Sequence, residues 1–336
     1  MLALIGNRLL GTVPTVIGII LVTFALTRSL PGDPAVYFAG PAADAESIAQ
    51  VRESMGLNAS LPVQLTRYVQ GLVQGEWGVS MKTGRPVTEE LANRLPASIE
   101  LTFLALLLAI AVAVPLGVLA ATRPNSPIDH ICRIIVTAGV SMPVFFTGLL
   151  LVYVFYTVLG WAPSPMGRLD IAHIAPAHVT GLYLVDSLVA GDFDTFVASL
   201  SHLILPATTL GIFALAPIAR MTRAAMLDVL ASDFIRTARA YGLGWRTVLV
   251  TYALRNAILS VLTTLGIVFS FLLGANVLVE TVFSWPGIGS FAVNALVASD
   301  YSAVQGFVLV MALLFVTLNM LIDLAYTLID PRVGLG

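Results

Sequence analysis

The chain has 336 residues, of which 58% are hydrophobic and 11% are charged, with a mean hydropathy of +0.93 and a formal net charge of −2. Water-soluble domains are roughly half apolar, so this composition excludes an ordinary soluble protein and indicates a membrane protein. The single cysteine, Cys132, excludes an internal disulfide and a thiolate metal cluster, and we expect it to be a small buried side chain. We expect this chain to bind no metal, cofactor or nucleic acid.

Six uncharged apolar runs are long enough to cross a bilayer, which takes about 17 to 25 residues. They cover Leu9–Thr27, Leu101–Thr122, Ile134–Gly160, Leu203–Ala219, Ala257–Val279 and Tyr301–Ile322. The first run exceeds the usual core of a secretory signal and no convincing cleavage site follows it, so we expect a retained helix. Ser141 and Pro143 favour a bend in the third helix.

Arginines predict the orientation of these helices in the membrane. If both termini lie in the cytoplasm, the cytoplasmic pieces hold ten arginines and five acidic residues, and the outer pieces hold seven basic and fourteen acidic residues. Short loops beside spanning helices carry excess Arg and Lys on the cytoplasmic side, so we predict two cytoplasmic termini.

The first external segment, residues 31–96, is long enough to form a small cap of its own. Two helices are predicted within it: Asp44–Met55, closed by Gly56, and Leu61–Gln74, closed by Gly75. Proline near a helix start and glycine just past its end are typical of such boundaries. A second external insertion, residues 161–202, contains a weaker apolar run that is too short and too polar to span the membrane.

The cytoplasmic segment 228–256 is cationic and joins the fourth and fifth spanning helices. Helical spacing puts Leu230, Phe234, Ala238 and Tyr241 on one face, and Gly242 stands where a left-handed residue would end this helix. A second amphipathic helix should start at Trp245, which predicts a helix-turn-helix under the membrane. Such an element can rest on anionic headgroups, but the small residues at its corner favour docking in a protein cleft.

These motifs resemble the permease subunits of binding-protein-dependent ATP-binding-cassette importers. "RTARAYG" at Arg236 is similar to their cytoplasmic loop pattern of Glu-Ala-Ala, three residues and Gly. Arg236 replaces the Glu and Arg255 a later proline, as is usual in the branch for oligopeptides, dipeptides and nickel. Further matching stretches are "PGDPA" at Pro31, "GVSMPVFFTG" at Gly139, "TGLYLVDSLVAGDF" at Thr180, "ETVFSWPGIG" at Glu280 and "DPR" at Asp330. The chain is most similar to the first permease of dipeptide importers.

The resemblance implies an all-α polytopic protein with the type I importer permease fold. Residues 1–30 would hold the first spanning helix, 31–96 the periplasmic cap, and 97–336 the permease core. The partners would be a second homologous permease, two nucleotide-binding ATPase subunits that use ATP and Mg, and a periplasmic solute-binding protein, all at the bacterial inner membrane. The residues that would contact the ATPase subunit are Asp233, Arg236, Thr237, Ala238, Tyr241, Gly242 and Leu243.

On the outer face, two groups of residues are candidates for the gate or for contact with the binding protein. Trp285, Pro286 and Gly287 form a rigid corner beside the outer end of the fifth helix. The acidic residues Asp186, Asp192 and Asp194 in the insertion could steer a basic patch on a partner, an effect that salt weakens.

The function implied by the resemblance is ATP-driven import of short peptides, with dipeptides first among them. Related systems carry nickel, opines or haem-related solutes, and these stay as alternatives. An ion-coupled secondary transporter is a further alternative, disfavoured because Arg28, Glu100, Glu280 and Asp323 all sit at span ends. The chain is not predicted to be an ATPase, because its only lysine, Lys82, follows Met81 and forms no phosphate loop.

Overall fold

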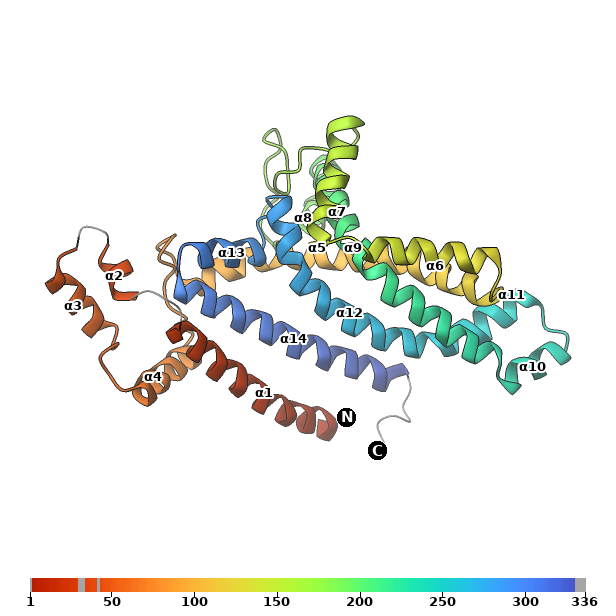
Figure 1. Ribbon diagram of the computed structural model, residues 1–336, viewed down its shortest axis with the longest axis horizontal. Helices are drawn as coiled ribbons and strands as arrows, with labels where there is room; N and C mark the ends of the chain where they lie inside the picture. Colours follow the sequence, from red (N-terminus) through yellow and green to blue (C-terminus); the bar gives the residue numbers. More distant parts are fainter. Residues whose placement is uncertain (1, 30–33, 41–42, 330–336) are drawn as a thin grey trace. The chain divides into compact units, whose positions relative to one another are not determined.

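The computed structural model describes residues 2–29, 34–40 and 43–329 (Figure 1). These residues form two compact units: Met1–Leu95 with Gly287–Thr317, called unit 1, and Pro96–Pro286 with Leu318–Gly336, called unit 2. The elements described are helices, with one isolated β-bridge between Val79 and Pro86. Most of the "PGDPA" stretch and all of the "DPR" stretch lie outside the described residues.

Unit 1 contains the helices of two separate chain segments. They are α1 (Leu2–Ser29), α2 (Pro34–Ala39), α3 (Ala45–Ser54), α4 (Leu61–Gln74), the start of α5 (Val87–Thr122), α13 (Ile288–Val297) and much of α14 (Tyr301–Ile329). The carboxylate of Asp44 caps α3 by accepting from the Ser47 N–H at 2.9 Å. Gly75 closes α4 with a left-handed φ of 80°. Both predicted helices of the first external segment are therefore confirmed.

The core of unit 1 explains why α5 starts before Leu95, where we expected the cap to end. Val87 and Leu91 in its first turns are buried against Phe291 of α13 and Ala303 of α14. Glu89 and Glu90 add negative charge at the helix start, which the helix dipole favours.

Unit 2 contains the remaining helices. They are the rest of α5, α6 (Pro127–Val140), α7 (Val144–Leu151), the π-helix η1 (Val152–Val158), α8 (Tyr183–Ala190), α9 (Phe193–Leu230), α10 (Asp233–Ala240), α11 (Trp245–Thr247), the π-helix η2 (Val248–Leu254), α12 (Arg255–Val282) and the end of α14.

Small residues along α5 let it approach α9 closely. Ala105, Ala109, Ala113 and Gly117 recur every four residues, which puts them on one helix face, and all four are buried. A Cβ added to Gly117 would lie 2.6 Å from the Thr222 Cβ and 2.8 Å from the Ala219 carbonyl oxygen. Stripes of this kind let helix backbones come together in membranes, where burial of apolar side chains alone gives little driving force.

Among the described residues, four helices are long and apolar enough to span a membrane: Val87–Thr122, Phe193–Leu230, Trp245–Val282 and Tyr301–Ile322. They contain four of the six predicted spans. The third predicted span is a bent pair, α6 and α7, interrupted at Ser141–Pro143 as expected, and Figure 1 shows α7 turned away from α6. For the first span, the continuous stretch of described side chains in α1 is Val13–Ala25, which is shorter than a span, so the full length of this span is not tested.

Candidate functional site

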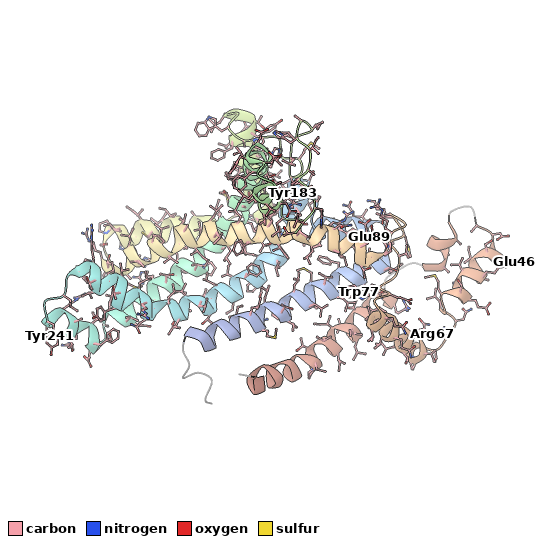
Figure 2. All side chains as sticks on the ribbon, turned by 180° about the vertical axis from the view of Figure 1, so that it is seen from behind. Glu46, Arg67, Trp77, Glu89, Tyr183 and Tyr241 are labelled. Carbon is pink, nitrogen blue, oxygen red and sulfur yellow. The ribbon has the colours of Figure 1, made fainter. Side chains whose placement is uncertain are left out.

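The segment between α9 and α12 folds as one short helix, α10, followed by a tight corner. α9 ends at Leu230, and α10 begins at Asp233, directly after Ser232. Figure 2 shows Tyr241 at the outer end of this segment. Because both flanking helices are long enough to span a membrane, α10 is placed where a contact with another protein could act on two spans at once.

The inner face of α10 differs from the predicted one. Ile235 and Ala238 are buried, with exposed fractions of 0% and 5%, whereas Phe234 and Tyr241 are 46% and 83% exposed. The sequence places Phe234, Ala238 and Tyr241 on one face, but Ala238 is buried while the two aromatic residues are exposed, so Ala238 is not accessible for the predicted contact with an ATPase subunit. An eight-residue helix with two apolar rows can bury either row, and only packing against its neighbours selects Ile235 with Ala238.

The buried face joins α10 to the ends of three other helices. Ile235 and Ala238 belong to one cluster with Ala121 of α5, Met226 of α9 and Val248 of η2. Met226 and Val248 are fully buried. A displacement of α10 must therefore move the adjoining turns of α9 and η2, because close-packed side chains transmit strain.

The solvent-exposed face of α10, which we call its outer face, carries residues that are common in protein interfaces. Asp233 and Arg236 form an ion pair of 3.4 Å, and their side chains are 96% and 78% exposed. Thr237 is exposed as well, and its hydroxyl donates to the Asp233 carbonyl at 3.0 Å. With Phe234 and Tyr241, this face combines exposed aromatic side chains with an arginine, residue types that are enriched in protein interfaces.

The corner after α10 confirms the prediction for Gly242. This residue has a φ of 76°, in the left-handed region that glycine adopts without strain. Leu243 donates its N–H to the Ala238 carbonyl at 3.3 Å, and Gly242 donates to the Arg239 carbonyl at 2.9 Å. These two bonds form the Schellman motif that commonly ends helices. A Cβ on Gly242 would meet nothing within 4 Å, so the corner is not crowded by this chain itself.

The predicted second amphipathic helix is not a separate element. α11 starts at Trp245 as expected, but it continues through η2 into α12, and the whole stretch Trp245–Val282 counts as one spanning helix. The guanidinium of Arg239 lies 4.8 Å from the Trp245 ring, which fixes the corner to the start of this helix. The segment is thus one docked helix and one long span, and the helix-turn-helix expectation was wrong in its second half.

The external insertion is held to α5 by a buried ion pair that no sequence pattern predicts. The Arg168 Nη2 donates to Glu100 at 2.6 Å and to the Gly181 carbonyl at 3.0 Å. Its guanidinium carbon lies 3.4 Å from the Tyr183 ring centroid, while the other Glu100 oxygen accepts from the Leu184 N–H at 2.8 Å. The residues are far apart in the chain, so no local spacing could reveal this pair.

Asp186 does not lie on a surface that a partner could touch, although we expected it there. It is 1% exposed and accepts hydrogen bonds from the N–H groups of Val179, Thr180 and Gly181 and from the Thr180 hydroxyl. Burial raises the pKa of this carboxyl, and the four hydrogen bonds lower it more, so the net pKa lies below the ordinary value. Asp186 therefore closes a loop rather than presenting charge to solvent.

Asp192 and Asp194, the other acidic candidates, are exposed at the start of α9. Asp192 caps this helix by accepting from the Thr195 N–H at 3.0 Å and from its hydroxyl at 2.7 Å. The Asp194 side chain is 91% exposed and lies 3.5 Å from His173. Of the three predicted contact residues, these two present negative charge outward.

The candidate gate residues differ in exposure. Trp285 is 1% exposed, and its Nε1 donates to the Ala97 carbonyl at 3.0 Å, so it is a core residue of unit 2. Pro286 is exposed and Gly287 is buried at the start of α13. Trp285 thus anchors this corner and presents no surface for a partner. Within the described residues, no group of three or more His, Cys, Asp or Glu side chains is placed to hold a metal ion.

Comparisons with known proteins agree over the whole length of the chain. The family described as "Binding-protein-dependent transport system inner membrane component" matches residues 113–335, and the N-terminal family of the same transport systems matches residues 1–102. The chain is 45% identical to the probable D,D-dipeptide transport system permease protein DdpB of Escherichia coli K12, covering 99% of this chain and 98% of that protein. It is 41% identical to the dipeptide transport system permease protein DppB of the same organism, with 99% of each chain covered.

A solved structure has the same fold. The inward-facing MetNI methionine ABC transporter matches with a TM-score of 0.52 and 15% identity, covering 70% of this chain and 93% of the matched chain. At this identity the match concerns the fold alone. The predicted all-α fold of a type I importer permease is confirmed.

Proposed function

Because the chain belongs to the family of binding-protein-dependent transport system inner membrane components, we propose that it forms, with a second permease, the membrane path of an ATP-driven dipeptide importer. It is a multi-pass permease subunit of a peptide transporter of the inner membrane. The relatives named as dipeptide permeases cover it from end to end, which supports dipeptides over nickel, opines or haem-related solutes.

The observation that carries the proposal is the two-sided character of α10. Its inner face is fixed to the ends of α5, α9 and η2 by Ile235 and Ala238, while Tyr241 and Phe234 are left exposed. We infer that an ATPase subunit binds this outer face on the cytoplasmic side and that its closure moves α9 and α12 through the buried cluster. Both termini would then be cytoplasmic, as the distribution of arginines predicts.

ATP hydrolysis belongs to partner subunits in this proposal. The chain has one lysine, Lys82, and the sequence around it, Met81-Lys82-Thr83, lacks the glycines of a phosphate-binding loop. ATP and Mg would be bound by two nucleotide-binding subunits, and a periplasmic binding protein would deliver the peptide.

A pair of tyrosine variants tests the contact. Tyr241→Ala removes the most exposed aromatic of the outer face, and we expect co-purification of the ATPase subunit and import of labelled dipeptide to fall about tenfold, as for truncation of an interface anchor. Tyr156→Ala is the control, because Tyr156 is an exposed tyrosine of η1, outside segment 228–256. Equal effects of both variants on ATPase recovery would contradict the assignment of α10.

The ion-coupled alternative needs a separate measurement. Proteoliposomes that contain the assembled transporter should take up dipeptide only with binding protein and ATP. Uptake driven by a proton gradient alone would favour a secondary transporter instead.

A further inference from the structure

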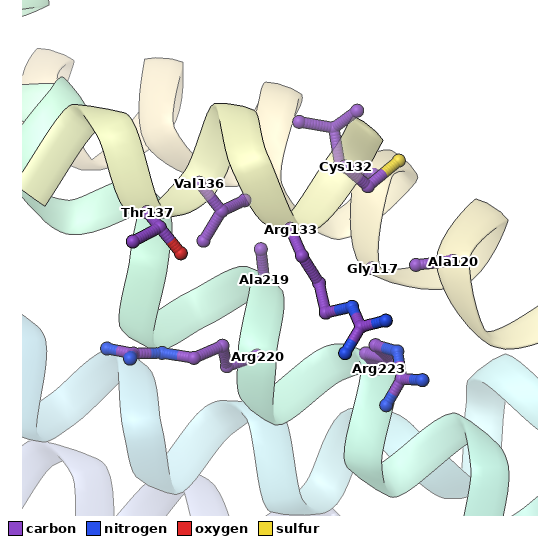
Figure 3. Close-up of a pocket in the computed structure, with 10 residues that line it drawn as sticks. Gly117, Ala120, Cys132, Arg133, Val136, Thr137, Ala219, Arg220 and Arg223 are labelled. Atoms are coloured by element: carbon purple, nitrogen blue, oxygen red, sulfur yellow. The ribbon is translucent and has the colours of Figure 1, made fainter. Parts of the chain in front are cut away.

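A cavity of about 280 Å³ opens between α5, α6 and α9, close to the ends of α5 and α9 that adjoin α10 (Figure 3). Gly117 and Ala120 of α5, Val136 of α6 and Ala219 of α9 form an apolar wall. We call it the arginine cavity, because three arginines also line it.

Arg133, Arg220 and Arg223 bring their positive charges to this one cavity. Arg223 is held by Asp129, with two hydrogen bonds of 2.8 and 2.7 Å. Arg133 lies 3.5 Å from the same carboxylate and 2.8 Å from the His130 Nδ1. Figure 3 shows the guanidinium groups of Arg133 and Arg223 near one another, while the side chain of Arg220 extends away from both.

The carboxylate of Asp129 does not neutralise this group of arginines. Asp129 is fully buried, and its oxygens already accept two bonds from Arg223 and one from the Asn125 N–H. Arg133 and Arg223 therefore face one carboxylate, which leaves an excess of one positive charge there, and Arg220 adds a third arginine to the cavity lining. The Arg220 Nε donates to the Ala216 carbonyl of its own helix at 3.3 Å.

The surface beside the cavity is apolar. On faces of the same two helices that do not line the cavity, Ile131, Ile134 and Ile135 of α6 are 56%, 67% and 48% exposed, and Leu119 of α5 is 52% exposed. Side chains of this kind match acyl chains, while the arginines match a phosphate group. One molecule class carries both features: a phospholipid whose headgroup is anionic.

We propose that the arginine cavity binds the headgroup of an anionic phospholipid from the cytoplasmic leaflet, with the acyl chains outside the cavity. The choice of leaflet rests on the orientation in the proposed function. The volume equals roughly nine water molecules, enough for a phosphate and its glycerol but not for the acyl chains. Basic pockets between spanning helices on the cytoplasmic side are suited to such headgroups. Through Arg223 of α9, the lipid would stabilise one arrangement of α5, α6 and α9 beside segment 228–256.

Retention of lipid by the full-length chain tests the site directly. The chain is purified in mild detergent, and bound phosphatidylglycerol is counted by native mass spectrometry. We expect Arg133→Gln with Arg220→Gln to lower the bound fraction about tenfold or more, since each arginine contributes about fivefold. The control is Arg123→Gln with Arg246→Gln, which makes the same charge change at exposed arginines outside the cavity. Equal retention by both double variants would overturn the proposal.

Cys132 gives a second readout that needs no substitution, because it is the single cysteine of the chain and lines this cavity. Its alkylation by N-ethylmaleimide is followed in vesicles of phosphatidylcholine with or without phosphatidylglycerol, and with inorganic phosphate. We expect phosphatidylglycerol to slow alkylation severalfold and inorganic phosphate to leave it unchanged. Protection by phosphate alone, or equal alkylation in both vesicles, would contradict a lipid site. Neither readout depends on peptide import, so failure here leaves the proposed function standing.

Discussion

The guanidinium of Arg168 lies 2.6 Å from the carboxylate of Glu100, and both side chains are only 7% exposed. The pair connects a loop of the external insertion to α5, and its two charges are shielded from water. Removal of one partner from such a pair costs about 3–5 kcal/mol, since it leaves the other charge buried alone.

We therefore predict that Arg168→Met destabilises the chain more than Arg168→Met combined with Glu100→Gln. The glutamine removes the unpaired charge and still accepts from the Leu184 N–H. Thermal unfolding of the detergent-purified protein measures the difference. A double variant that unfolds at the same temperature as Arg168→Met, or below it, would show that the unpaired charge of Glu100 does not cause the loss of stability.

Close approach of α5 and α9 predicts opposite outcomes for two glycine substitutions. Gly117→Ala places a Cβ 2.6 Å from Thr222 and should destabilise the helix pair by about 1–3 kcal/mol through overpacking. Gly274→Ala in α12 meets nothing within 4 Å and should be neutral or stabilising, because alanine favours helix. The yield of monodisperse protein and its thermal unfolding compare the two, and a harmless Gly117→Ala would refute the close contact.

The left-handed corner at Gly242 predicts a graded series. Gly242→Asn should be tolerated, because asparagine adopts a positive φ at little cost, whereas Gly242→Val should cost about 1 kcal/mol or more in backbone strain. Since no atom of this chain crowds the position, any larger loss of import for Gly242→Val must come from a bound ATPase subunit. Comparison of unfolding with import in the two variants separates strain from lost docking. Full import by Gly242→Val in an assembled complex would remove the corner from the contact.

The buried carboxylate of Asp186 predicts how the external loop responds to acid. Its folded pKa is lowered from 3.8, so its contribution to stability is complete above that value and is lost as pH falls through the lower folded pKa. The protection factors of the Thr180 and Gly181 amides, taken relative to the intrinsic exchange rate at each pH, should stay high down to about pH 4 and fall only below it. Asp186→Asn should lose this protection even at pH 7, because its NH₂ group would face N–H donors. Protection in the variant equal to that of the original would disprove the role of the carboxylate.

Exposed charge at the start of α9 predicts a contribution to binding of the periplasmic partner. Asp192→Ser keeps the helix cap, because serine caps as well as aspartate, and Asp194→Asn removes the second charge. At low salt this double variant should show reduced stimulation of ATP hydrolysis by the binding protein, with the basal rate unchanged. Unchanged stimulation would remove this surface from the docking site.

Local patterns in the sequence were enough for the spanning helices and their caps. Runs such as Leu203–Ala219 have a length that only a bilayer explains, and Asp44 and Gly75 end their helices by bonds to neighbours in the chain. The left-handed Gly242 was predictable for the same reason, since helix termination depends on a few adjacent residues.

Only the tertiary structure decided which faces of these elements are buried and which are exposed to solvent. Ile235 rather than Phe234 is buried because α9 and η2 supply the cavity that receives it, and Asp186 is buried because the preceding turn aims three N–H groups at it. Arg168 finds Glu100, and Arg223 finds Asp129, across long stretches of chain. Such pairings depend on how the helices approach one another. That approach is determined by the packing of small residues along α5 and α9 as a whole, and no local spacing in the sequence encodes it.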